Sequence, residues 1–399
     1  MATYDVTIVL PSGTYYLTIP PLNADGDESG DLDLTGNHLI RIQGAGAAST
    51  IIDANHIDRA FTVHAGSSGS ITSVTVRNGT VAGRDGGGIN VNYNGNLAVV
   101  ASRVSGNTTD SSGGGIENDG TLYVTGSAVS GNNALAGGGI SNYGSVLLNE
   151  STMAGNTASE NGGGLYSGGS LDVIQSTINA NTADFNGGGI YSFGNFSDLT
   201  LTDSTVAINE AVRNGGGIYH QGNSANLYNV TIAYNDADYN REGYFGGGVY
   251  VAAGANLNVR NSLLAANTME NTPIYDDCDG DGHLVSYGRN VLGTDASTLS
   301  GCNITPASGS LWDNLNSLAF LGGLAYNGGP TQTIALLNGN NAIDAGDPAF
   351  GFACLTPYSG PLNADQRGFT RPAGVYCDLG AFEYGAVNPD DEIFKNGFE

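Results

Sequence analysis

Hydrophobic residues alternate with polar ones in short runs along most of the chain, and helical periodicity is absent. In the run 170–181 we expect Leu171, Val173 and Ile178 to point inward, and Asp172 and Gln175 to face solvent. Alternation over four or five residues is typical of a β-strand with one buried face. Gly or Asn separates successive runs. The pattern therefore predicts an all-β chain built from repeated units of three strands.

Glycine triads and asparagines mark a repeat with a period of about 25 residues. The triads begin at Gly86, Gly113, Gly137, Gly162, Gly187, Gly215 and Gly246, and the asparagines are Asn107, Asn132, Asn156, Asn181, Asn209, Asn235 and Asn267. Three strands per period form one coil of a parallel β-helix, in which coils stack about 4.8 Å apart. A leucine-rich repeat is the alternative solenoid, but it requires a denser leucine pattern.

We therefore expect a right-handed parallel β-helix of about eleven coils over residues 1–310. A C-terminal capping region is expected over 311–385, followed by an acidic tail over 386–399. The capping region should cover the open end of the solenoid, whose edge strands would otherwise be exposed. Gly permits the positive φ of a tight corner. Stacked Asn side chains hydrogen-bond from coil to coil, so both repeated residue types are interpreted as structural.

Charge limits the classes of partner. Asp and Glu number 38 against 12 Lys and Arg, giving a formal net charge of −26. Nucleic acid and anionic lipid bind through Lys and Arg, so neither is expected as a partner. No stretch approaches the roughly 20 apolar residues that span a bilayer, so no membrane span is expected. Strand-like sequence follows Met1 directly, and we expect that a secretion leader has been removed.

All four cysteines lie in the last third of the chain, without the spacing of a zinc site. We expect two local disulfides, Cys278–Cys302 and Cys354–Cys377, and hence an oxidising compartment. Four free, buried thiols are the alternative.

Several segments resemble a known family. GDLDL (30–34), IQGAGAASTIID (42–53), DRAF (58–61) and the GGGI coils resemble bacterial β-helix proteins that carry a CSLREA motif, although the motif itself is missing here. NGGPTQTIALLNGNNAIDAG (327–346) and DQRGFTRPAGVYCDLGAFE (365–383) are similar to the choice-of-anchor Q domain. The resemblance implies a pectate-lyase-like fold and a secreted or surface-attached bacterial protein. It implies no single activity, because fold alone does not fix function.

Catalytic residues are hard to identify. The NTD, GHG and RIK motifs of pectin hydrolases are absent from the sequence, and basic residues in the coils are few. The best clusters for a polysaccharide lyase or glycoside hydrolase are Arg213 beside Glu210, and Arg241 beside Asp238 and Glu242. Exposed turn charges are the alternative interpretation of both. We therefore expect a binding protein rather than an enzyme.

One outward column of the repeat contains Tyr166, Tyr191, Tyr219 and Tyr250. A row of exposed aromatic rings on a rigid face suits sugar rings, and self-stacking that stabilises the sheet is the alternative. A second outward column contains Thr152, Thr177, Thr205 and Thr231. A Thr array is typical of ice-binding β-helices, but only one column of four is present here.

Two acidic loops have oxygens at alternate positions, as calcium loops do. The candidate ligands are Asp25, Asp27, Asp31 and Asp33 in the first loop and Asp277, Asp279 and Asp281 in the second. Solvated turns are the alternative for both loops. Taken together, the sequence predicts a secreted or cell-surface bacterial adhesion protein that binds extracellular polysaccharide or a host or matrix glycan through the tyrosine column, with calcium as its only candidate cofactor.

Overall fold

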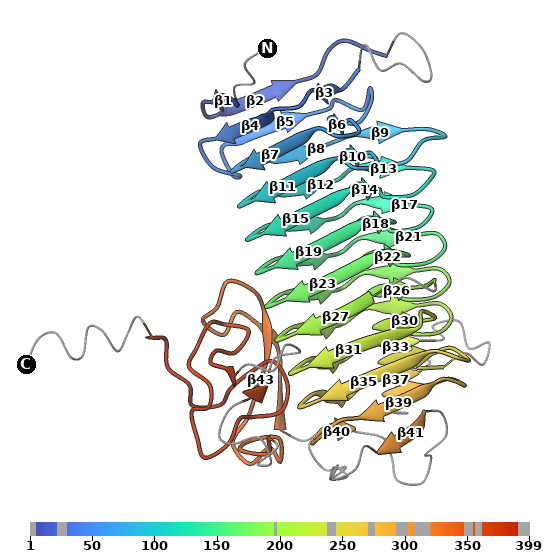
Figure 1. Ribbon diagram of the computed structural model, residues 1–399, viewed down its shortest axis with the longest axis vertical. Helices are drawn as coiled ribbons and strands as arrows, with labels where there is room; N and C mark the ends of the chain where they lie inside the picture. The colour runs from blue at the N-terminus through green and yellow to red at the C-terminus, as the bar shows by residue number, and fades with distance from the viewer. Residues whose placement is uncertain are drawn as a thin grey trace, which may run out of the picture. The chain divides into compact units, whose positions relative to one another are not determined.

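The computed structural model describes residues 5–21, 30–194, 198–237, 245–269, 276–292, 302–306, 320–346, 354–355 and 361–389. The chain divides into two compact units. The first unit is Met1–Leu171 with Asn179–Ser197, and the second is Asp172–Ile178 with Asp198–Glu399. The predicted parallel β-helix is confirmed, with about nine turns against the about eleven expected. Within each unit, the strands of successive coils stack one above the next (Figure 1).

Successive coils form four parallel sheets, which we number I to IV, with sheet I holding the strand that follows the glycine triad. Each strand of sheet IV has only two residues and lies before the next triad. A strand this short shows no alternation, so the sequence did not reveal it.

In the first unit, the strands of sheet I are β3 (Leu32–Leu34), β6 (Phe61–Val63), β10 (Ile89–Val91), β14 (Ile116–Asn118), β18 (Ile140–Asn142), β22 (Leu165–Ser167) and β26 (Ile190–Ser192). Those of sheet II are β1 (Val6–Leu10), β4 (Leu39–Gly44), β7 (Ser68–Thr72), β11 (Asn96–Val100), β15 (Thr121–Thr125) and β19 (Ser145–Asn149). Those of sheet III are β2 (Gly13–Tyr16), β5 (Thr50–Asp53), β8 (Thr75–Arg77), β12 (Arg103–Ser105), β16 (Ala128–Ser130) and β20 (Thr152–Ala154). Those of sheet IV are β9 (Thr80–Val81), β13 (Thr108–Thr109), β17 (Asn133–Ala134), β21 (Thr157–Ala158) and β25 (Thr182–Ala183).

Two strands, β23 (Ser170–Ile174) and β24 (Thr177–Asn179), have residues in both units. In the second unit, sheet I has β30 (Ile218–His220), β34 (Val249–Val251) and β38 (Cys278–Asp279). Sheet II has β27 (Asp198–Thr202), β31 (Ser224–Tyr228), β35 (Asn256–Arg260), β39 (His283–Ser286) and β41 (Asn303–Pro306). Sheet III has β28 (Thr205–Ala207), β32 (Thr231–Ala233), β36 (Leu263–Ala265) and β40 (Val291–Leu292), and sheet IV has β29 (Glu210–Ala211), β33 (Asp236–Ala237) and β37 (Thr268–Met269). The C-terminal region adds β42 (Leu321–Ala325), β43 (Thr333–Leu336), β44 (Cys354–Leu355) and β45 (Pro361–Leu362).

The core and the asparagine ladder agree with the sequence. Leu171, Val173 and Ile178 are buried as expected. In the first unit, Asn107 donates from Nδ2 to Oδ1 of Asn132 over 2.9 Å, and the same bond is repeated in the next coils. In the second unit the ladder ends on Asp277, whose Oδ1 accepts from Asn267 Nδ2 over 2.7 Å. These bonds satisfy polar groups that have no access to water.

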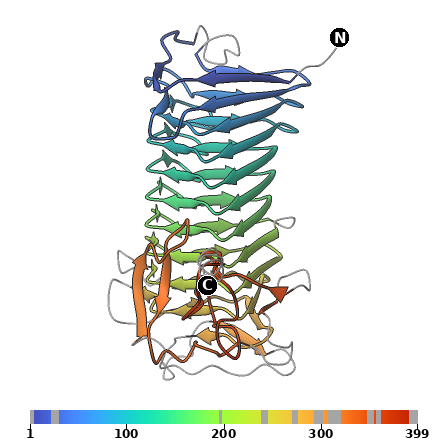
Figure 2. The same ribbon diagram turned by 90° about the vertical axis from the view of Figure 1, so that its left-hand side faces the viewer.

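The C-terminal region packs against a side of the second unit, which differs from the expected cover over the solenoid end. Thr177 donates to the carbonyl of Gln332, and Thr205 donates to Oε1 of Gln366, each over 2.6 Å. The described C-terminal residues lie beside the coils of this unit (Figure 2). Thr177, Thr205 and Thr231 of the second column are therefore buried, so they cannot form a free ice-binding surface.

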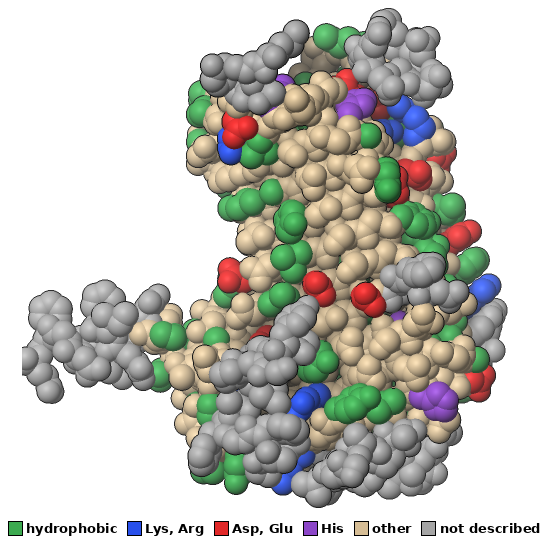
Figure 3. Space-filling model, in the orientation of Figure 1, with side chains coloured by type: hydrophobic (Ala, Val, Ile, Leu, Met, Phe, Trp, Pro, Cys, Tyr) green, Lys and Arg blue, Asp and Glu red, His purple; other side chains and the backbone are tan. Residues whose placement is uncertain are grey.

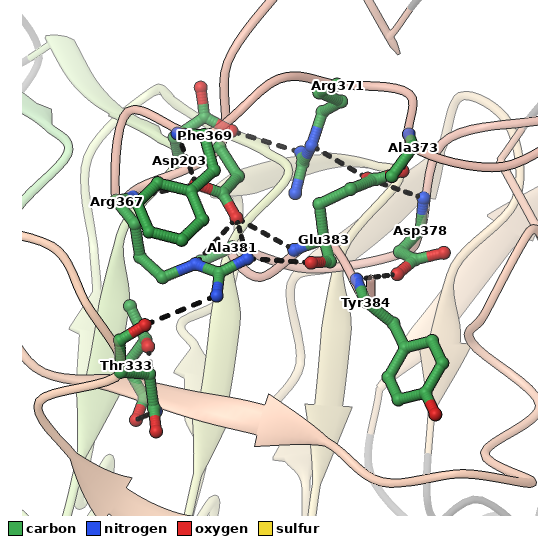
Figure 4. A network of polar contacts seen from close by, with 12 residues as sticks. Asp203, Thr333, Arg367, Phe369, Arg371, Ala373, Asp378, Ala381, Glu383 and Tyr384 are labelled. Atoms are coloured by element: carbon green, nitrogen blue, oxygen red, sulfur yellow. Dashed lines mark hydrogen bonds and ion pairs between the residues drawn. The ribbon is translucent and has the colours of Figure 1, made fainter. Parts of the chain in front are cut away.

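Buried charges hold the C-terminal region in place (Figure 4). Arg371 lies 3.1 Å from Asp203 of the solenoid and 3.1 Å from Glu383. Arg367 pairs with Asp365 over 2.6 Å. Burial raises the pKa of Asp203, and burial together with Glu383 raises that of Asp378 to about 7. Asp378 therefore keeps its proton to a higher pH than a water-exposed carboxyl does.

The disulfide Cys278–Cys302 is present as predicted. Cys377 is also disulfide-bonded, while the side chain of Cys354, its predicted partner, lies outside the described residues. Within the described part of the chain, no helix has the length and hydrophobicity needed to cross a membrane.

Candidate functional site

The outward face of sheet I in the first unit changes from polar to aromatic along the stack. Its central positions are in register across seven strands. In order they are Asp33, Thr62, Asn90, Glu117, Ser141, Tyr166 and Tyr191. At about 4.8 Å per strand, these seven positions extend over about 29 Å. The face is thus a straight, rigid row of side chains whose chemistry changes in steps.

Four aromatic rings, Tyr143, Tyr166, Tyr191 and Phe193, form a cluster at one end of this row. Tyr166 and Tyr191 stack with ring centroids 5.4 Å apart and planes 9° apart. The Phe193 centroid lies 4.5 Å from that of Tyr166. Gly168 leaves the space that this ring fills, because a Cβ there would come within 2.7 Å of it. We call these four residues the aromatic cluster.

Stacking changes what the tyrosine column can offer to a ligand. The faces of Tyr166 and Tyr191 cover each other, as do those of Tyr219 and Tyr250 in the second unit, which are 5.1 Å apart. The self-stacking ladder that the sequence left open is therefore present. Tyr143, whose ring is edge-on to Tyr166, remains 51 % exposed. A sugar would therefore meet the ring edges of the column and the exposed rim at Tyr143.

Glu117 is the most unusual residue of the row. Its side chain is only 3 % exposed, and its Oε2 has no hydrogen-bond partner among the described residues. Burial, with a further contribution from Asp85, raises its pKa to about 9. Glu117 is consequently protonated at neutral pH, which is the form that a proton donor requires.

The corner at Ser112 and Gly113 brings Glu117 and Asp85 together. Asp85 Oδ1 accepts from the Ser112 amide over 3.0 Å. Oε2 of Glu117 lies 2.8 Å from the position that a Cβ on Gly113 would occupy. Burial and the charge of Asp85 also raise the pKa of Asp119, two residues beyond Glu117. An acidic group of three carboxyls therefore adjoins the aromatic cluster.

The first predicted calcium loop is partly described. Asp25 and Asp27 lie outside the described residues. Asp31 accepts a 2.5 Å bond from Thr62, and Asp33 lies 2.7 Å from Nε2 of His64. Burial raises the pKa of Asp31 despite the bond from Thr62.

In the second loop, Asp277 is fully buried at the end of the asparagine ladder, and burial raises its pKa to about 7. Burial and the charge of Asp276 raise the pKa of Asp279 to about 6, while Asp281 lies in the turn that follows. Across the described ranges, no group of three or more His, Cys, Asp or Glu side chains is placed to hold a metal ion.

The predicted catalytic candidates lie elsewhere. Glu210 is exposed on β29, Arg213 is half-buried before its glycine triad, and Arg241 lies outside the described residues. The acidic group at Glu117 was not predicted. Its position in the outward column was visible in the sequence, but alternation implied exposure. The triad glycine at Gly113 was the available signal, because it leaves room for the carboxyl to fold inward.

No family model, no curated protein and no solved structure matches this chain.

Proposed function

We propose that this chain is a secreted or cell-surface bacterial protein that binds carbohydrate along sheet I of its first unit, in adhesion to an extracellular polysaccharide or a host or matrix glycan. The aromatic cluster beside a straight polar row is the observation that carries the proposal. Aromatic rims contact the apolar faces of sugar rings, while the part-exposed side chains of Asp33 and Asn90 hydrogen-bond to hydroxyls.

Two further features support this function. Much of the visible surface in Figure 3 carries neither charged nor hydrophobic side chains, which suits an uncharged ligand rich in hydroxyls. The disulfide Cys278–Cys302 is stable in the oxidising conditions outside a cell. The resemblance to CSLREA-type and choice-of-anchor Q proteins agrees with secretion by a bacterium.

A glycan array followed by calorimetry tests the proposal. Tyr143→Ala removes a ring of which about 100 Å² is exposed, and covering half of that area is worth about 1.3 kcal/mol. We therefore expect affinity to decrease about tenfold. Tyr123→Ala is the matched control, because Tyr123 is 46 % exposed but lies on sheet II of the same unit. Equal affinity for the parent and Tyr143→Ala would exclude the aromatic cluster as the binding surface.

Glycoside cleavage is a second candidate function, favoured by the protonated Glu117 beside Asp85. Glu117 would donate its proton to the leaving glycosidic oxygen while Asp85 or Asp119 accepts the proton of the attacking water. The proton then returns to Glu117 through solvent. Release of reducing ends from polysaccharide, abolished in Glu117→Gln but retained in Glu150→Gln, would establish this activity. Glu150 is exposed in the same unit. No release by the parent protein would leave binding alone.

A further inference from the structure

A hollow lies on sheet II of the second unit, and the proposed function does not use it. It has a volume of about 290 Å³ and is lined by Asn226, Tyr228, Asn258, Val259, Arg260 and Tyr287. This volume is at the lower end of the range for small-molecule sites. The hollow therefore has room for about one sugar residue.

The register of three strands builds the hollow. Asn226 pairs with Asn258, and Tyr228 pairs with Arg260, between β31 and β35. Tyr287 follows β39, and its amide donates to the carbonyl of Val259 over 2.9 Å. Because alternate residues of a strand share a face, the two asparagines form one column. Tyr228, Arg260 and Tyr287 form the next column, in which neighbouring residues lie on strands about 4.8 Å apart.

The asparagine column offers both a donor and an acceptor. Nδ2 of Asn258 donates to Oδ1 of Asn226 over 2.9 Å and to Oγ of Ser224 over 3.0 Å. These bonds fix the two amide groups relative to one another. Nδ2 of Asn226 and Oδ1 of Asn258 are then the atoms that a ligand hydroxyl would meet. Such a donor and acceptor side by side suit the vicinal hydroxyls of a sugar.

The aromatic and arginine column adds charge. Arg260 is the one cationic residue in the lining, in a chain whose formal net charge is −26. Arg260 lies between Tyr228 and Tyr287 in the same column, an arrangement that favours stacking of its planar guanidinium on the rings. Tyr287 is 49 % exposed. A guanidinium forms its strongest hydrogen bonds with carboxylate and sulfate-like oxygens.

We propose that this hollow binds one acidic sugar residue, with Arg260 bound to its carboxylate or sulfate and the asparagine pair bound to its hydroxyls. The site is independent of the aromatic cluster, so either can fail without the other. It would give the protein a selective subsite for acidic saccharides.

Three matched trisaccharides test the proposal by calorimetry on the full chain: a glucose trimer, the same trimer ending in glucuronic acid, and the trimer with a terminal 6-sulfate. We expect one or both acidic trimers to bind at least tenfold more tightly than the neutral trimer. The difference between the two acidic trimers identifies the anionic group. Arg260→Gln should reduce this affinity at least tenfold, Arg260→Lys should restore part of it, and Tyr287→Ala should reduce it about fivefold.

Tyr123→Ala provides the control, because Tyr123 lies in the first unit, outside both proposed binding surfaces, and its replacement should leave the acidic trimers unaffected. Circular dichroism verifies that each variant is folded. If Arg260→Gln does not fold, Tyr287→Ala decides the question. Equal affinity for neutral and acidic trimers, or unchanged acidic binding in a folded Arg260→Gln or Tyr287→Ala, would overturn the proposal. Loss of neutral glycan binding in Tyr143→Ala alone would concern the aromatic cluster and not this hollow.

Discussion

Replacing Glu117 with glutamine should change how the stability of the protein depends on pH. The carboxyl has a pKa of about 9 when folded, compared with 4.5 in an unfolded chain. A group that binds its proton more tightly when folded contributes most to stability at low pH. That contribution is fully present below about pH 4.5 and is lost as the pH rises towards about 9. Glutamine keeps the shape of the neutral acid and removes the titration.

The magnitude follows from the shift. Each pH unit between the two pKa values costs the parent about 1.4 kcal/mol, so the range from about pH 5 to pH 8 costs at most about 4 kcal/mol. Relaxation around the buried carboxyl reduces this figure, and we expect about 2–4 kcal/mol. Glu117→Gln should therefore gain this much stability relative to the parent between about pH 5 and pH 8.

Urea unfolding followed by circular dichroism from pH 5 to pH 9 measures the effect, with hydrogen exchange of β14 and β18 as a local readout. Glu150→Gln, on the exposed surface of the same unit, should follow the parent at every pH. If the free energy of unfolding depended on pH in the same way in the parent and in Glu117→Gln, Glu117 would titrate as an ordinary carboxyl, and the reasoning from its burial would be wrong.

Three further predictions concern the scaffold. In urea unfolding, Gly113→Ala should destabilise the protein by at least about 1 kcal/mol more than Gly126→Ala. Both glycines have positive φ, but only Gly113 has close neighbours. Equal losses of stability would contradict the crowding between Gly113 and Glu117. Arg371→Met should lower the free energy of unfolding by about 3–5 kcal/mol, because it leaves Asp203 and Glu383 without their partner, and it should expose the C-terminal region to proteolysis. Arg41→Met, at an exposed ion pair, should have neither effect. Opening Cys278–Cys302 by replacing both cysteines with serine should cost about 3 kcal/mol for a separation of 24 residues, and an unchanged unfolding midpoint would show that the loop is already constrained.

The sequence was sufficient for the coils because each coil repeats the same local rules. Alternation fixed which residues of β23 face inward, and the periodic asparagines fixed the ladder. The fourth strand pair was missed because two residues are too few to show a period. The correctly predicted features depend on contacts between residues one coil apart, and a sequence repeat shows which residues those are.

The repeat pattern could not predict where the C-terminal region packs or that the acidic group at Glu117 is buried. Thr177 and Thr205 read as outward positions, and only contacts made more than 150 residues later in the chain bury them. The switch to Ala207, Ala233 and Ala265 at outward positions of sheet III was the available signal that something covers that side. Glu117 was missed for a related reason, because its burial depends on how the corner at Gly113 folds.

The contacts of the C-terminal region also determine how many coils the second unit can have. They begin at the carbonyl of Gln175, which accepts from Thr331, and end at Arg289, which donates to the carbonyl of Ala345. Inserting or deleting a coil between these points would displace one end by about 4.8 Å and break every later contact. The described contacts place no such restriction on the coils from Gly86 to Ser167. The number of repeats is therefore fixed in one part of the chain, whereas evolution or design can lengthen the row of outward side chains on sheet I in the other.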